Sequence, residues 1–116
     1  MKPINYEELR RIVDFIKLEE EYYTLRYHSR EYRITLLDLP DRHSFGLQGR
    51  GGAPSYIFVS SRKKSKPLEI GGNIMRELVR LHLLQEGMPK RAANREAIKF
   101  QQGYLEDDLK DVFLRY

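Results

Sequence analysis

The stretch Tyr22–Leu39, YYTLRYHSREYRITLLDL, decides the class of the fold. Apolar and polar side chains alternate through both of its halves, which is typical of two half-buried strands. The short polar segment His28–Glu31 between the halves has the length of a hairpin loop. This stretch therefore predicts an antiparallel β-hairpin. Its apolar positions are Tyr23, Leu25, Tyr27, Tyr32, Ile34 and Leu36.

Two further strands follow the hairpin. Pro40-Asp41 marks a turn, Ser44–Gln48 is a short strand candidate, and Ser55–Ser61 is a stronger one. The simplest arrangement of four successive strands is an antiparallel β-meander, which we predict here. The seven aromatic rings in this region are expected mostly to cover the core: Tyr22, Tyr23, Tyr27, Tyr32, Phe45, Tyr56 and Phe58.

Helices are predicted before and after these strands in the sequence. Asn5 has the position of an N-cap, and apolar residues recur at helical spacing after it, at Leu9, Ile12, Val13 and Ile16. We expect this first helix to end near Glu20 and to dock on the sheet through those four residues.

The last third of the chain predicts two to three helices packed on one sheet face. Gly71-Gly72 is interpreted as a break and Asn73 as the cap of a helix that ends at Gly87. A helix from Pro89 to about Gln102 and a final amphipathic piece after Gly103 would follow. Residues 1–116 are thus expected to form a single α+β domain.

Composition restricts the function classes. The chain has no cysteine, and its 41% hydrophobic and 33% charged residues are typical of a soluble globular protein. The N-terminal residues have no secretory signal pattern, and apolar runs of about four residues are too short to span a bilayer, so a cytoplasmic location is expected. No histidine spacing of a zinc site occurs, so no metal or cofactor is predicted.

The net charge of +4 is concentrated in one segment. Residues 62–101 carry ten basic and four acidic side chains, whereas residues 1–61 are balanced and residues 102–116 are acidic. Such asymmetry favours an anionic partner, and we predict a nucleic acid, either DNA or RNA. A protein-interaction module or a homodimer, with mixed-charge helices and aromatic strands as its surface, stays open as the alternative.

Three sets of basic residues are the candidate phosphate contacts. One is a loop, one is a helical stripe with a spacing of four, and one is an arginine within four glycines. Each also has a plain structural interpretation, as a solvated loop, a solvated helix face and a flexible hairpin loop. The sets are Arg62, Lys63, Lys64 and Lys66; then Arg91, Arg95 and Lys99; then Arg50 between Gly49 and Gly51.

A catalytic function has weaker support. His28 and His43 both lie at predicted turn edges, where they would meet across the sheet and act with nearby arginines as a small metal-independent ribonuclease. Both are also ordinary turn residues. Exposed aromatic rings beside arginines would stack on single-stranded bases, but no string such as Lys-Gly-Phe-Gly-Phe occurs, so a known RNA-binding module is not indicated and binding through phosphates is the favoured hypothesis.

Overall fold

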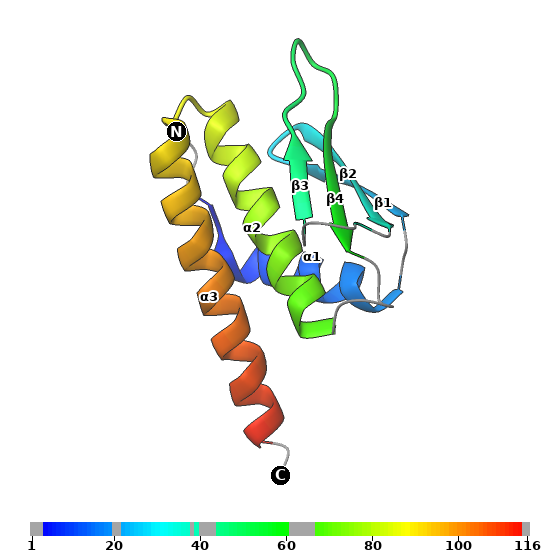
Figure 1. The fold of residues 1–116 in the computed structure, drawn as a ribbon, viewed down its shortest axis with the longest axis vertical. Helices are drawn as coiled ribbons and strands as arrows, with labels where there is room; N and C mark the ends of the chain where they lie inside the picture. Colours follow the sequence, from blue (N-terminus) through cyan, green and yellow to red (C-terminus); the bar gives the residue numbers. More distant parts are fainter. Residues whose placement is uncertain (1–3, 20–21, 38, 40–43, 61–66, 115–116) are drawn as a thin grey trace.

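The computed structural model describes residues 4–19, 22–37, 39, 44–60 and 67–114 (Figure 1). In chain order the elements are α1 (Tyr6–Glu19), β1 (Tyr22–Tyr27), β2 (Arg30–Leu37), β3 (Ser44–Leu47), β4 (Ser55–Ser60), α2 (Pro67–Gln85) and α3 (Lys90–Leu114). The α+β class is therefore confirmed.

The sheet is mixed, so the prediction of an antiparallel meander is wrong. Its strand order is β1-β2-β4-β3, and β2 pairs with β4 in parallel. The hairpins β1–β2 and β3–β4 are antiparallel as expected. β4 lies beside β2 in the middle of the sheet, with Ile57 and Val59 fully buried, and the short β3 is left at the edge. At that edge a Cβ on Gly46 would lie 2.8 Å from an Arg80 nitrogen of α2, so a larger residue here would require the side-chain ends of the helix to shift.

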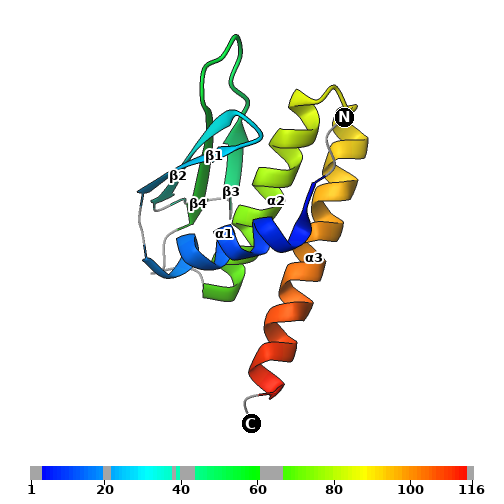
Figure 2. The ribbon, with the colours of Figure 1, turned by 180° about the vertical axis from the view of Figure 1, so that it is seen from behind.

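The core lies between one face of the sheet and the helices. Leu25, Tyr27 and Ile34 from the strands share a buried cluster with Ile74 and Leu78 of α2. α2 runs alongside β3 and β4, and α1 crosses α2 near the lower ends of the strands (Figures 1 and 2). From α1, Leu9, Val13 and Ile16 are buried as expected, whereas Ile12 is only half-buried.

α3 packs against α2 more than against the sheet, with the two helices antiparallel (Figure 1). The predicted breaks at Gly71-Gly72 and Gly103 are wrong, because both helices continue through their glycines. A Cβ on Gly71 would clash with the ring and hydroxyl of Tyr104, so this glycine permits close helix packing. Gly87, with φ 94°, does end α2: the amides of Gly87 and Met88 donate to the carbonyls of Leu84 and Leu83.

Candidate nucleic-acid interface

The sheet face opposite the core carries a row of aromatic rings. Phe58 of β4 stacks on Phe45 of β3 with ring centroids 4.8 Å apart, and on Tyr56 of its own strand at 6.3 Å with the planes only 9° apart. The three rings are half-buried. No described helix packs over them, because α1 and α2 bury the other face.

Strand register extends this row across the sheet. Phe45 and Phe58 are directly paired, Thr35 lies beside Phe58, and Tyr22 lies beside Thr35 at the far edge. Tyr22 is 55% exposed. The expectation that the strand aromatics mostly cover the core therefore holds for Tyr27 and Tyr32 but is wrong for the residues of this outer face.

The neighbouring row adds a cation. It runs from Thr24 through Arg33 and Tyr56 to Leu47. The Arg33 guanidinium lies 5.8 Å from the Tyr56 ring centroid and donates a hydrogen bond of 3.3 Å to the Tyr56 hydroxyl. Tyr56, and then the hydrogen bond to Glu31, raise the pKa of Arg33, so its guanidinium stays charged.

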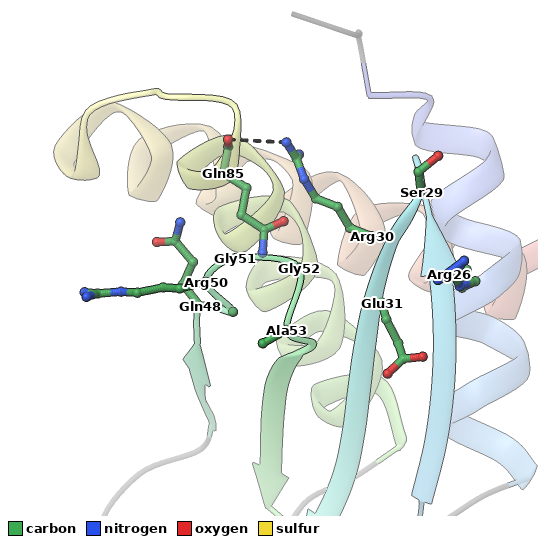
Figure 3. A pocket seen from close by; sticks show the side chains of 11 residues that line it. Arg26, Ser29, Arg30, Glu31, Gln48, Arg50, Gly51, Gly52, Ala53 and Gln85 are labelled. Carbon is green, nitrogen blue, oxygen red and sulfur yellow. Dashed lines mark hydrogen bonds between the residues drawn. The ribbon is translucent and has the colours of Figure 1, made fainter.

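A third row, Arg26 and Glu31, leads to a pocket at the end of the sheet. This pocket has a volume of about 490 Å³ and lies between the β1–β2 turn, the β3–β4 loop and the C-terminal end of α2 (Figure 3). Three arginines line it: Arg26, Arg30 and Arg50. The aromatic rows and this pocket together form what we name the outer-face site.

Arg30 is held in place by α2. Its guanidinium forms an ion pair with Glu86 at 3.2 Å and donates to the Gln85 carbonyl at 3.3 Å. A cation at the C-terminal end of a helix is stabilised by the helix dipole. In Figure 3 the Arg30 side chain turns toward Gln85, whereas the Arg50 side chain lies on the opposite side of the glycine loop and extends away from Arg30.

The turn beside the pocket is strained. His28 and Ser29 are the central residues of a two-residue hairpin turn, with φ of 50° and 64°. Both values lie in the left-handed region, which such a turn requires and which residues other than glycine adopt at a cost.

The histidines do not meet as predicted. His43 lies outside the described residues, and His28 instead contacts His82 of α2, with ring centroids 5.0 Å apart. Tyr27 packs against both imidazoles. His28 is not among the residues that line the pocket, so it does not face the three arginines. The sequence contained no signal for this pair, because His28 and His82 belong to elements that meet only in the folded chain.

Two of the three predicted basic sets, Arg50 and the α3 stripe, lie within the described residues. Arg62, Lys63, Lys64 and Lys66 lie outside the described residues. Arg91, Arg95 and Lys99 are exposed on the first half of α3, and Lys99 pairs with Glu96 at 3.2 Å.

The position of this stripe along α2 follows from the helix packing. A groove on α2 and α3 is lined by Arg76, Arg80, Lys90 and Asn94, whereas the start of α2 meets Gln101 and Tyr104. The stripe therefore begins beside the C-terminal half of α2.

Sequence reasoning thus missed the outer face and most of the pocket. The signal for the face was present in the alternation itself, because Tyr56 and Phe58 stand out of phase with the buried Ile57 and Val59.

Within the described ranges, no group of acidic, histidine or cysteine side chains could hold a metal ion, and no helix has the length and apolar character needed to cross a membrane. Comparisons with protein-family models, with curated proteins and with solved structures found no match.

Proposed function

We propose that this protein binds single-stranded nucleic acid, DNA or RNA, on the outer face of its sheet. The observation that carries the proposal is the stacked set Phe45, Phe58 and Tyr56 on a face that no described helix covers. Unstacked bases gain about 1–3 kcal/mol each by stacking on such rings, and they do so with little dependence on sequence. A duplex, whose bases are already stacked, has no comparable use for this surface.

Cations are positioned beside the rings to meet the phosphates of the strand. Arg33 lies in the Tyr56 row and Arg26 in the next row toward the pocket. The residues after β4, Arg62 to Lys66, are proposed to contribute further phosphate contacts. The stripe Arg91, Arg95 and Lys99 is proposed as a separate phosphate-contact surface on α3. A cytoplasmic location belongs to the same proposal.

The test is equilibrium binding of a fluorescent single-stranded hexanucleotide, as RNA and as DNA, followed by anisotropy at low salt. We expect Phe58→Ala to weaken binding by about 5- to 150-fold, which corresponds to the loss of one stacked base. Phe15→Ala is the matched control, because Phe15 is 51% exposed on α1 and lies off the outer face. Equal effects of the two variants, or no binding by the folded wild-type protein, would refute the proposal.

A second copy or another protein is the alternative occupant of this face. Leu47 is 55% exposed beside the half-buried rings, and apolar surface of this kind also serves protein interfaces. Sedimentation across a range of protein concentrations separates the two readings. A dimer that Leu47→Glu dissociates, in a protein that binds no oligonucleotide, would support the interaction module.

The ribonuclease hypothesis is tested with the same hexanucleotide. Incubation of the RNA form with the protein across a wide pH range should leave it intact. Cleavage that His28→Ala or His43→Ala abolishes, with the fold retained, would establish the enzyme instead.

A further inference from the structure

The pocket at the end of the outer face stands where a bound strand would end. Successive rows on the sheet are two residues apart, so Arg26 lies about 14 Å beyond the Phe58 row along the strands. This is a distance that two or three nucleotides cover. Beyond Arg26, the pocket is enclosed by the β3–β4 loop and by Gln85 of α2 (Figure 3). The volume of about 490 Å³ is in the range of small-ligand sites.

The pocket has cationic side chains that are not paired with an anion among the described residues. Within the described part of the chain, Arg26 and Arg50 have no side-chain hydrogen bond or ion pair. The one carboxylate in the lining, Glu31, is engaged by Arg33 at 3.1 Å. Both free arginines are exposed, so their guanidiniums can turn toward an anion at the rates of surface side chains.

Backbone donors add to these guanidiniums. Gly51 and Gly52 line the pocket with φ of 59° and 86°, and their amides form no hydrogen bond with the described residues. Neighbouring atoms of the loop are fixed, because the Gly49 amide donates to the Ser55 hydroxyl at 2.9 Å and the Ala53 amide to the Arg50 carbonyl at 3.1 Å. The loop therefore presents two free N–H groups from a closed turn.

We infer that this pocket binds the terminal phosphate monoester of the strand on the outer face. The inference rests on the proposed function. A monoester carries a charge of about −1.5 to −2 at neutral pH and has three acceptor oxygens, whereas an internal phosphodiester carries only −1. Two guanidiniums and two amides without a partner among the described residues, together with a third guanidinium held by Glu86, fit the greater charge and the larger number of acceptors.

The experiment compares three hexanucleotides of one sequence, with a 5′-phosphate, with a 3′-phosphate and with hydroxyl groups at both ends. We expect one phosphorylated form to bind the wild-type protein about tenfold more tightly than the hydroxyl form, and the preferred end gives the strand direction. The double variant Arg26→Ala/Arg50→Ala should bind all three hexanucleotides about equally; its affinity for the hydroxyl form should also fall, because Arg26 meets a phosphate of the strand, but by less than its affinity for the phosphorylated form. Arg11→Ala, at an exposed arginine of α1, should retain the preference.

The outcomes separate the two proposals. Equal binding of all three hexanucleotides, with sensitivity to Phe58→Ala, overturns the terminal-phosphate site and leaves the proposed function standing. A preference that survives in the double variant also overturns it, because the phosphate then binds elsewhere. Binding of none of the three removes both proposals. A 5′-mononucleotide that competes as well as the phosphorylated hexamer would assign the pocket to free nucleotides, against our inference.

Discussion

Tyr32 shows at the scale of single residues how the sheet is joined to the end of α2. Its ring is fully buried, and its hydroxyl donates a hydrogen bond of 3.1 Å to the Gln85 side-chain oxygen. The Gln85 side-chain nitrogen in turn donates to the Ser55 hydroxyl, which accepts the Gly49 amide. The buried Tyr32 hydroxyl is therefore linked by hydrogen bonds to two parts of the pocket lining, Gln85 of α2 and the β3–β4 loop at Gly49.

This position predicts a pH effect on stability. Burial raises the pKa of Tyr32 to about 12, from 10 in the unfolded chain. The neutral phenol is thus favoured by folding, so its contribution is complete below pH 10 and is lost as the pH rises from 10 through 12. Tyr32→Phe should cost about 1 kcal/mol at pH 7, because Gln85 loses its donor, and should lose less stability than the wild type between pH 10 and 12.

Urea unfolding at a series of pH values measures this difference. The two proteins differ only in the Tyr32 hydroxyl, so the difference between the two curves isolates Tyr32. Parallel curves up to pH 12 would show that the Tyr32 hydroxyl ionises equally in the folded and unfolded chains.

Residues whose partners are close in the sequence were predictable. Asn5 caps α1 through a 3.1 Å hydrogen bond from the Glu8 amide, and Gly87 ends α2, both as the sequence pattern indicated. The contact between His28 and His82 was not predictable in this way. It depends on α2 crossing the β1–β2 turn, and no local preference of either residue reports that crossing.

At the scale of elements, alternation predicted the existence of strands but not their order. An alternating strand has the same pattern whether its neighbours are parallel or antiparallel. What places β4 beside β2 is tertiary burial, because β4 has a continuous inner face from Ser55 to Val59, whereas β3 has only four residues. The same reason hid the outer-face site, since its aromatic rows run across all four strands, which are paired out of sequence order.

The glycines of the helices were wrongly predicted to be breaks, because a glycine in a helical pattern can either end the helix or let a neighbouring element pack closely against it. Gly71 is required by a neighbour, since its Cβ would meet the Tyr104 ring, which is fully buried and donates to Asp14 at 2.8 Å. Gly103 has no such neighbour, because the nearest atom to its Cβ would be a Tyr6 carbon at 4.0 Å.

A pair of substitutions distinguishes these causes. Gly103→Ala should stabilise the protein by about 1 kcal/mol, since alanine favours the helix. Gly71→Ala gains the same helix preference but forces Tyr104 or the helix to move, so we expect a net destabilisation of about 1–3 kcal/mol. Thermal unfolding of the two variants is the measurement. Stabilisation by both would mean that α2 and α3 can separate without cost.

At the scale of the whole molecule, the candidate phosphate contacts among the described residues lie on two surfaces rather than on one. Arg26 and Arg33 accompany the aromatic rows on the sheet, whereas Arg91 and Arg95 lie on α3, which packs against α2. Composition alone located the excess of charge in residues 62–101 but carried no information about the face on which each cation lies.

The dependence of binding on salt reports how many phosphates each surface contacts. The slope of log affinity against log salt is about −0.7 per phosphate on a single strand and about −0.9 on a duplex. A strand held by Arg26, Arg33 and Arg50 should give a slope near −2. Because α3 is separate from the sheet, Arg91→Ala/Arg95→Ala should leave this slope unchanged with the hexanucleotide and flatten that of a duplex by about 1.8. Equal flattening for both ligands would show that the strand reaches α3 and that the two surfaces act as one.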